Sequence, residues 1–355
     1  MAVFLPNWVG DVVMATPALR ALRRGLREAR ITYVGRPASL ATLAGSPDAD
    51  GAIADRSARA PKAAATWELV RQLRRARLDL AVLLPNSFRT ALVAKLGGAR
   101  RAAGYDRDGR GLLLSDKLDP PRGPDGRKVP TPAMDYYIRL VEHLGVACPS
   151  RQMTVPVLEA DRDAAEALLA CAGADDGRPV VMLNPGASFG TSKMWDPSRY
   201  AALADLLIER RGAAIVINAA PSERPIARQV ERAMRHEPAA SFARRDNSLG
   251  LLKALLGRCD LLVTNDTGAR HLGAAMGVGV VTLFGSTDPQ WSRIDYGRER
   301  IVRVAVDCAP CQKKLCPLPA GPTYHQCMER ITPRMALEAA EQLLDGEPPR
   351  KEASA

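Results

Sequence analysis

The sequence predicts an α/β protein built from two doubly wound, Rossmann-like domains. A chain of 355 residues is long for one domain and suits two of ordinary size. Short apolar runs alternate with amphipathic helical segments in two successive series, which is typical of parallel sheets covered by helices. Residues 260–285 show the pattern most clearly, with a predicted strand, a tight turn, a short helix and a second strand.

The first series starts almost at the first residue. Its predicted elements are a strand at 2–5, a helix at 14–26, strands at 31–34 and near 52–54, a helix at 66–77, a strand at 80–84, a helix at 88–96, a short strand at 102–105 and a helix at 133–144. Residues 106–132 are rich in Gly, Pro, Asp and Arg, so they are predicted to form a long loop. A linker near 148–157 closes an N-terminal domain at 1–155.

The second series forms the predicted C-terminal domain, residues 156–330. Its predicted elements are a helix at 160–171, a strand at 180–183, a polar loop at 184–194, a helix that starts at Asp196-Pro197, a strand at 214–217, helices at 223–235 and 249–256, a strand at 261–264, a helix at 269–276 and strands at 278–284 and 302–306. A last helix within 331–345 and a disordered tail at 346–355 complete the chain.

The composition limits the classes of partner and the location. Fifty Lys and Arg against 39 Asp and Glu give a net charge of +11, which favours anionic partners such as acidic lipid or phosphorylated sugar. The basic residues are dispersed and not interleaved with aromatics, so no nucleic-acid partner is expected. The N-terminus lacks a basic signal-peptide start, and no apolar run reaches about 18 residues. We therefore expect a cytoplasmic protein that contacts a membrane peripherally.

The turn after the strand at 261–264 is a candidate phosphate site. Asp266 follows the strand, Thr267 and Gly268 form the turn, and His271 falls in the first turn of the next helix. Backbone N–H groups at a helix start suit a phosphate. An ordinary turn with a helix cap explains this unit alone equally well.

The loop that leaves the strand at 180–183 is a second candidate. Small residues, hydroxyls and one lysine at the carboxyl end of a strand are typical of a phosphate cradle. The order of residues excludes a Walker A loop, and a plain surface loop is the alternative. The candidate ligands are Ser188, Thr191, Ser192 and Lys193.

Asp11 is the candidate general base. It follows the first strand, and Gly10 allows a ligand to approach the backbone beside it, with Trp8 at the start of the same loop. The alternative is that Asp11 caps the following helix.

Four cysteines lie within 20 residues near the C-terminus. Cys308, Cys311, Cys316 and Cys327 are spaced by two, four and ten residues, which fits neither common zinc pattern. A structural site for zinc or an iron–sulfur cluster and a loop with free thiols are both compatible with this spacing. No catalytic metal is predicted.

Four motifs in this order resemble glycosyltransferase family 9. They are Trp8-Val-Gly-Asp-x2-Met-Ala-Thr-Pro-Ala-Leu, Ala103-Gly-Tyr, Asn184-Pro-Gly-x8-Trp195 and Asn265-Asp-Thr-Gly-x2-His-Leu-Gly-Ala-Ala. The likeness covers nearly the whole chain and is nearest to the heptosyltransferases of the lipopolysaccharide core, where the Trp-Val-Gly-Asp start favours the second type over the first.

The resemblance implies a GT-B fold, with an N-terminal acceptor domain, a C-terminal nucleotide-sugar domain, a central cleft and a last helix that packs back toward the first domain. It implies inverting transfer from ADP-heptose without a cofactor or catalytic metal, with Asp11 as base and Trp8 and Gly10 on the acceptor side. The implied donor residues are Ser188 and Lys193 at the diphosphate, with Thr191 and Ser192 as exchangeable candidates, then Asp266, Thr267, Gly268 and His271, and Glu223 at the ribose or base.

The implied acceptor is an anionic glycolipid, heptosyl-Kdo-lipid A, at the inner face of the inner membrane. Three alternatives stay open at this stage. They are another family 9 transferase with a different nucleotide sugar or acceptor, a sugar-nucleotide epimerase of the same architecture, and a cysteine-loop metal-binding protein with a vestigial transferase site.

Overall fold

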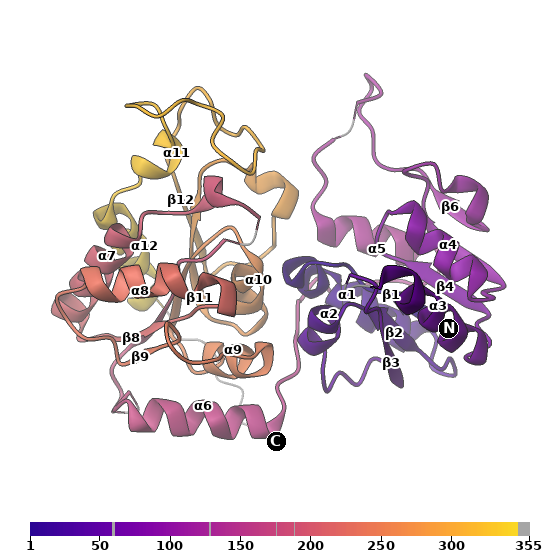
Figure 1. Cartoon of the computed structure of the whole chain (residues 1–355), viewed down its shortest axis with the longest axis horizontal. Coiled ribbons are helices and arrows are strands. Elements are labelled where there is room, and N and C mark those ends of the chain that lie inside the picture. The colour runs from indigo at the N-terminus through magenta and orange to yellow at the C-terminus, as the bar shows by residue number, and fades with distance from the viewer. Residues whose placement is uncertain (59–60, 128, 175, 188, 347–355) are drawn as a thin grey trace. The chain divides into compact units, whose positions relative to one another are not determined.

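The computed structural model describes residues 1–58, 61–127, 129–174, 176–187 and 189–346. These residues form two compact units (Figure 1). The first unit contains Met1–Pro156 together with Gln290–Ile294, and the second contains the rest of the described chain. Each unit is an α/β domain, as the sequence predicts, and its parallel sheet has six strands, one more than predicted in each unit.

The sheet of the first unit has the order β3-β2-β1-β4-β5-β6, and every pair is parallel. Its strands are β1 (Ala2–Phe4), β2 (Thr32–Gly35), β3 (Gly51–Ala54), β4 (Leu80–Leu83), β5 (Arg101–Tyr105) and β6 (Asp116–Leu118). The strand order reverses between β1 and β4. In sheets of this kind ligands bind outside the carboxyl ends of the strands at such a reversal.

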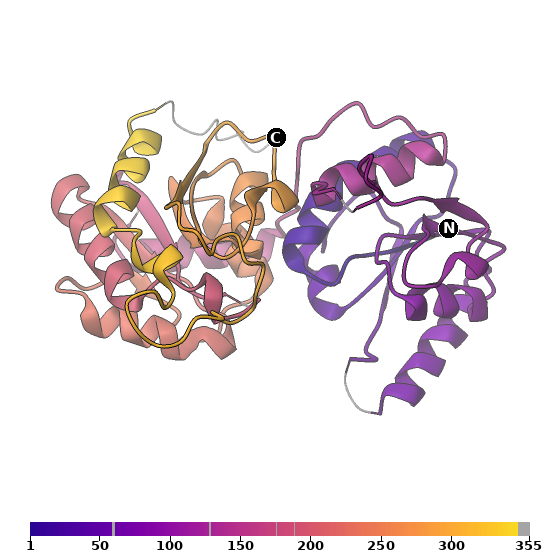
Figure 2. The ribbon, with the colours of Figure 1, turned by 90° about the horizontal axis from the view of Figure 1, so that it is seen from above.

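Helices cover both faces of this sheet (Figures 1 and 2). They are α1 (Val9–Gly25), α2 (Pro37–Thr42), α3 (Lys62–Arg75), α4 (Phe88–Leu96), a short 3-10 helix η1 (Gly111–Leu113) and α5 (Ala133–His143). Leu22 of α1 and Leu140 of α5 belong to the core on one face. Leu73 of α3 and Ala91 of α4 belong to the core on the other face. The two apolar layers explain why the central strands are apolar on both sides.

Helix α1 begins earlier than the sequence predicts. Its N-cap is Trp8, and Asp11 lies in the first helical turn, so the alternative in which Asp11 caps the helix is wrong. Pro17 lies inside the helix and has no N–H to donate. The hydroxyl of Thr16 donates to the carbonyl of Val13 at 2.7 Å instead, and the helix continues past the proline.

The predicted loop at 106–132 is wrong in part, because it contains η1 and β6. Strand β6 is only three residues long and two of the three are charged, so it carries no apolar pattern. It pairs at the sheet edge with β5, where Arg101 forms a 2.6 Å ion pair with Asp116. Helix α2 was also not predicted, since six residues give too short a period to detect.

The second sheet has the order β12-β11-β10-β7-β8-β9, again all parallel. Its strands are β7 (Val180–Asn184), β8 (Ala214–Ile217), β9 (Ala240–Ser241), β10 (Leu261–Asn265), β11 (Gly279–Phe284) and β12 (Glu299–Arg303). Counted from β7, this is the same connectivity as in the first unit. The reversal lies between β7 and β10, the two strands that precede the predicted phosphate loops.

Helices and short 3-10 turns connect these strands. They are α6 (Glu159–Cys171), η2 (Thr191–Lys193), α7 (Pro197–Arg211), η3 (Pro221–Glu223), α8 (Arg224–Ala233), α9 (Leu249–Leu256), α10 (Gly268–Ala275), η4 (Pro289–Ser292), α11 (Gln326–Glu329) and α12 (Pro333–Leu344). The predicted start of α7 is confirmed, because Asp196 accepts a bond from the N–H of Ser198 and Pro197 begins the helix.

Helix α12 packs against α7 and against β10, β11 and β12. Its approach to the first domain stays a prediction, and residues 347–355 of the predicted tail lie outside the described residues. In the described part of the chain, no helix combines the length and the apolar character that crossing a membrane requires.

Candidate functional site

The candidate donor site lies at the strand reversal of the second unit. The loop after β7 carries Lys193, and the turn after β10 carries Asp266. Because β7 and β10 are neighbouring parallel strands, their carboxyl ends bring the two loops together. This is the position at which doubly wound sheets bind ligands.

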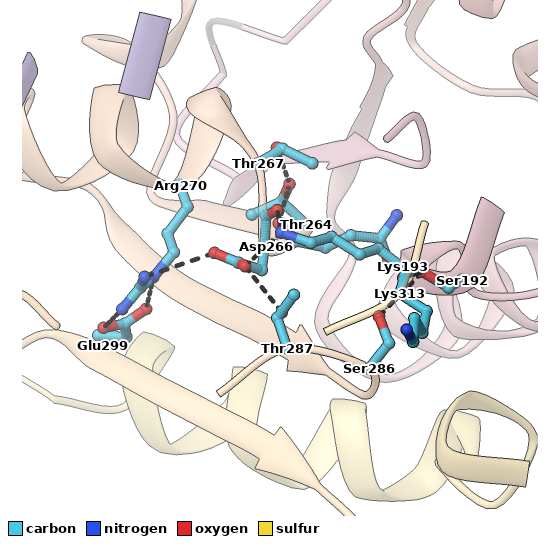
Figure 3. A network of polar contacts seen from close by, with 11 residues as sticks. Ser192, Lys193, Thr264, Asp266, Thr267, Arg270, Ser286, Thr287, Glu299 and Lys313 are labelled. Carbon is cyan, nitrogen blue, oxygen red and sulfur yellow. Dashed lines mark hydrogen bonds and ion pairs between the residues drawn. The ribbon is translucent and has the colours of Figure 1, made fainter. Parts of the chain in front are cut away.

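Lys193 and Asp266 form a buried ion pair at the centre of this site (Figure 3). The Lys193 Nζ lies 2.5 Å from Asp266 Oδ2 and also donates to the Asp266 carbonyl at 3.1 Å. Thr287, after β11, donates its hydroxyl to the same Oδ2 at 2.9 Å. The side chains of the pair are only 11% and 9% exposed, so the attraction between them is little screened.

Arg270 lies on the other side of Asp266 (Figure 3), and no sequence pattern predicted a role for it. Its guanidinium is 3.7 Å from Asp266 Oδ1 and forms a bidentate pair with Glu299 of β12, with Nε–Oε1 at 2.6 Å and Nη2–Oε2 at 2.9 Å. Thr282 of β11 also donates to Glu299, at 2.6 Å. A fully buried arginine with two carboxylate partners fixes the first turn of α10 to the sheet.

The charges set the protonation of the neighbouring groups. Burial alone would raise the pKa of Asp266, but the positive charges of Lys193 and Arg270 outweigh it and hold that pKa below its usual value. Burial, reinforced by Arg270, lowers the pKa of His271 to about 3, so its imidazole is neutral near pH 7. The Nδ1 atom of His271 is buried, and no described residue forms a hydrogen bond with it.

The start of α10 presents the backbone donors that the sequence predicts. Thr267 is the N-cap and Gly268 is the first helical residue. The Thr267 hydroxyl lies 3.2 Å from the hydroxyl of Thr264 and accepts from the Asn184 amide at 3.3 Å, so it is turned away from the helix. The first N–H groups of α10 are therefore not capped by this side chain, and a helix start of this kind attracts anions.

The three candidate hydroxyls of the β7 loop have different surroundings. Ser192 is buried, and its hydroxyl contacts the Ser286 hydroxyl at 3.0 Å and the Lys313 carbonyl at 2.5 Å. Thr191 is exposed at the start of η2. Ser188 lies outside the described residues. The hydroxyl of Ser192 is thus engaged in holding the loop, while that of Thr191 is open to solvent.

Glu223 lies beside the same loop although it follows β8. A Cβ placed on Gly186 would lie 2.1 Å from the Glu223 carboxyl carbon, so the carboxyl group occupies the space that this glycine leaves. The carboxylate accepts a bond from the N–H of Ala220 at 3.2 Å, and burial raises its pKa. The structure therefore brings Glu223 to the edge of the candidate donor site.

In the first unit, Asp11 stands at the strand reversal between β1 and β4. Burial, and then the charge of Asp11, raises the pKa of Tyr137 well above its usual value. Gly10 is buried beside Asp11 in the first turn, and the N-cap Trp8 is 57% exposed. Asn86, after β4, accepts a bond from the Tyr136 hydroxyl at 3.2 Å at the same edge of the sheet. Asp11 and Asn86 thus follow the carboxyl ends of two neighbouring strands, β1 and β4.

Comparison with known proteins identifies the family. Residues 66–320 match glycosyltransferase family 9 (heptosyltransferase). The chain belongs to this family. Family 9 membership makes it a glycosyltransferase, as the four motifs predict.

Curated relatives match this family 9 chain over nearly its full length. It is 28% identical to lipopolysaccharide heptosyltransferase 2 of Escherichia coli, with 96% of this chain and 97% of the relative covered. It is 24% identical to lipooligosaccharide heptosyltransferase 2 of Campylobacter jejuni, with the same coverage.

Solved structures show the same fold. The structure of the Escherichia coli ADP-heptose lipopolysaccharide heptosyltransferase II has a TM-score of 0.76 at 26% identity, over 97% of this chain and 98% of that one. A family 9 glycosyltransferase from Veillonella parvula has a TM-score of 0.82 at 23% identity, with 97% of each chain covered. The prediction of two Rossmann-like domains of the GT-B type is confirmed.

The cysteine segment of this glycosyltransferase is attached to the candidate donor loop. His325 Nε2 lies 3.0 Å from the Ser192 carbonyl, and the Ser192 N–H donates to the Lys314 carbonyl at 3.1 Å. A Cβ on Gly190 would lie 2.2 Å from the same Lys314 carbonyl oxygen. The segment therefore supports the loop that carries Lys193.

Two thiols of this segment contact the start of the helix that carries Cys327, because the His325 N–H donates to Cys316 Sγ at 3.3 Å and the Gln326 amide donates to Cys308 Sγ at 3.6 Å. Burial, followed by the effects of Cys308, Cys311 and Cys316, raises the pKa of Cys327 to about 11. No group of three or more His, Cys, Asp or Glu side chains within the described residues has the arrangement of a metal site. The structural metal site stays a prediction, and elemental analysis of protein purified without oxygen tests it. A preparation without stoichiometric zinc or iron would contradict it.

Proposed function

We propose that this chain transfers heptose from ADP-heptose to heptosyl-Kdo-lipid A, with inversion at the anomeric carbon and without a metal ion. The names of its curated relatives, which are heptosyltransferases of type 2 for lipopolysaccharide and lipooligosaccharide, support heptose transfer to such a glycolipid. The similar Escherichia coli enzyme of known structure is named for ADP-heptose, which supports this donor. The single observation that carries the proposal is the buried Lys193–Asp266 pair beside the start of α10, because this arrangement suits a nucleoside diphosphate.

The diphosphate is proposed to bind between Lys193 and the first turn of α10. Lys193 is paired with Asp266, but Asp266 has Thr287 and Arg270 as further partners. Lys193 can therefore turn toward a phosphate without leaving a buried carboxylate unpaired. The backbone N–H groups that follow Thr267 and the neutral imidazole of His271 would donate hydrogen bonds to the phosphate oxygens.

These groups also suit the chemistry of the leaving group. As the bond between the heptose and the diphosphate breaks, negative charge grows on the departing phosphate. The ammonium of Lys193 and the positive end of α10 stabilise that charge, as a metal ion does in other transferases. Glu223 is proposed to accept hydrogen bonds from the ribose hydroxyls, since a carboxylate beside a Rossmann loop commonly does so.

Asp11 is proposed to be the general base. It would remove the proton from the attacking acceptor hydroxyl, which bonds to the anomeric carbon while ADP leaves from the opposite face of the sugar. Trp8 and Gly10 would line the acceptor side. The acceptor is anchored in the inner face of the inner membrane, so we propose a cytoplasmic enzyme that binds this membrane peripherally.

The test is transfer from ADP-heptose to heptosyl-Kdo-lipid A, followed by mass spectrometry in the presence of EDTA. The wild-type chain is expected to add one heptose. The Asp11→Asn chain is expected to bind ADP-heptose normally, but its transfer rate should fall at least a hundredfold, because a general base typically contributes at least that factor to the rate. Binding without transfer by the wild type would refute the acceptor. A near-normal rate in Asp11→Asn would remove Asp11 from the role of base.

A further inference from the structure

Among the described residues, several large exposed apolar side chains gather on three neighbouring elements of the first unit. They are Trp67 on α3, Phe88, Leu92 and Leu96 on α4, and Leu112 on η1. Phe88, Leu92 and Leu96 are spaced by four residues, so they form a stripe along one side of α4. We call these five residues the apolar face.

The three elements that carry the apolar face are held together. Arg74 of α3 donates from Nε to the carbonyl of Leu96 on α4 at 2.8 Å. A Cβ on Gly97 would lie 2.8 Å from Leu73, which shows how closely the end of α4 approaches α3. Helix α4 also contacts η1. In Figure 2, α3 projects from the first unit, just after the grey trace at residues 59–60.

The opposite sides of α3 and α4 are in the core. Leu69 and Leu73 of α3 and Ala91 and Val93 of α4 pack on the sheet. The residues of the apolar face are therefore not needed to cover this sheet. Leu112 is 99% exposed, whereas its neighbour Leu113 packs against the core, so the chain places one leucine in solvent next to one that is covered.

Helices α3 and α4, which carry four of the five residues of the apolar face, have an excess of positive charge. Together α3 and α4 carry six Lys and Arg residues against one acidic residue, Glu68. Glu68 is itself paired with Arg71. Arg71, Arg75 and Lys95 are exposed on the same two helices. Exposed Trp, Phe and Leu side chains surrounded by Lys and Arg are typical of surfaces that lie in the interface of an anionic bilayer.

We propose that the apolar face, with Arg71, Arg75 and Lys95, docks the first unit on an anionic lipid bilayer. Its position suits an enzyme with a lipid-anchored substrate. Helix α4 starts after β4 and η1 follows β5, so Phe88 and Leu112 lie toward the carboxyl edge of the sheet. Asp11 follows β1 at the same edge. A bilayer on this face would hold a membrane-anchored acceptor near that edge.

Binding of the full chain to vesicles tests the proposal without either substrate, so the result does not depend on the proposed function. The wild type is expected to sediment with vesicles of phosphatidylethanolamine and phosphatidylglycerol much more than with phosphatidylcholine vesicles, and added salt should weaken the binding. The triple variant Leu92→Gln, Leu96→Gln, Leu112→Gln should lower the partition coefficient at least tenfold. Its matched control, Leu158→Gln, Ile301→Gln, Leu315→Gln, changes exposed apolar residues of the second unit and should bind as the wild type does.

A second variant separates charge from apolar contact. Arg71→Gln, Arg75→Gln, Lys95→Gln should weaken binding to the anionic vesicles roughly a hundredfold, because each basic residue near such a surface contributes about fivefold. Binding to phosphatidylcholine should not change. The emission of Trp67 should shift to the blue on binding, and this shift should be lost in a Trp67→Phe chain.

Three outcomes would overturn the proposal. The wild type could bind anionic and neutral vesicles equally, the control triple could lose as much binding as the leucine triple, or the leucine triple could bind as the wild type does. If light scattering then showed that the leucine triple turns a dimer into a monomer, the apolar face would be an interface between two copies of this chain.

Discussion

Replacing Lys193 by Met tests the candidate donor site most directly. The change removes the ammonium from a pair in which both side chains are about nine-tenths buried. Breaking a buried pair commonly costs about 3–5 kcal/mol. Asp266 keeps the Thr287 hydroxyl at 2.9 Å and Arg270 at 3.7 Å, so we expect a smaller loss of about 2–3 kcal/mol in the free energy of unfolding.

For a domain of this size such a loss lowers the melting temperature by roughly 5–10 °C. The reaction rate should also fall, because removal of one group that stabilises developing charge commonly lowers the rate by a factor of about 10²–10³. We expect kcat/KM for ADP-heptose to fall by that factor and the Kd for ADP to rise. Calorimetric melting, ADP titration and steady-state kinetics measure the three quantities.

Two comparisons make the test of Lys193 decisive. Lys117→Met removes a lysine whose pair with Asp106 spans 3.7 Å and is exposed, so it should change stability by less than about 1 kcal/mol and leave the kinetics unchanged. A double-mutant cycle with Asp266→Asn should give a coupling energy above about 1 kcal/mol. A coupling near zero, or an unchanged Kd for ADP in Lys193→Met, would refute the reasoning.

Two further predictions concern the residues around this pair. Burial and Arg270 lower the pKa of His271 to about 3, below the unfolded value of about 6.5, so the unfolded chain binds more protons between these values. The free energy of unfolding should therefore fall by up to about 1.4 kcal/mol per pH unit as the pH drops below about 6. When this free energy is measured by urea unfolding at several pH values, it should depend less steeply on pH in His271→Gln than in the wild type. The same dependence on pH in both chains would contradict this. Gly186→Ala should displace the Glu223 carboxyl, which can rotate away, so the KM for ADP-heptose should rise severalfold with little change in melting temperature, as in Glu223→Gln. A normal KM in both variants would exclude Glu223 from donor binding.

The sequence predicts the strands of both sheets well where they are apolar on both sides. Strands such as β7 and β10 are fully buried and appear as continuous apolar runs. The errors fall on short elements with polar residues, namely β6, β9, α2 and α11, whose formation depends on a neighbouring strand or helix already in place. The edge strand β12 lies at Glu299–Arg303, three residues before its predicted position at 302–306. The local sequence pattern does not show which neighbouring elements will stabilise such a short segment.

The residues of the candidate site also differ in how well the sequence predicts them. Lys193 and Asp266 could be predicted, because each follows a buried strand in a loop with glycine and hydroxyl residues. Arg270 could not, because an arginine on a short helix looks like a solvated residue until Glu299, on another strand, is seen beside it. The two phosphate-loop hydroxyls had equal sequence signals, yet Ser192 is engaged by Ser286 and a backbone carbonyl while Thr191 is exposed. Only the partners distinguish a hydroxyl that supports a loop from one that is open to a ligand.

The charges of the site explain why Lys193 should matter more than its neighbours for an anionic donor. Arg270 is positive, but Glu299 occupies its guanidinium with two hydrogen bonds, so little of its charge is left for a phosphate. His271 is neutral at pH 7 because burial and Arg270 oppose its protonation, so it can supply a hydrogen bond and no charge. The positive end of α10 is fixed and amounts to about half a charge. Among these groups, Lys193 alone combines a full positive charge with a partner carboxylate that has other partners to keep. This is why we expect Lys193 to move its charge from Asp266 to the proposed diphosphate.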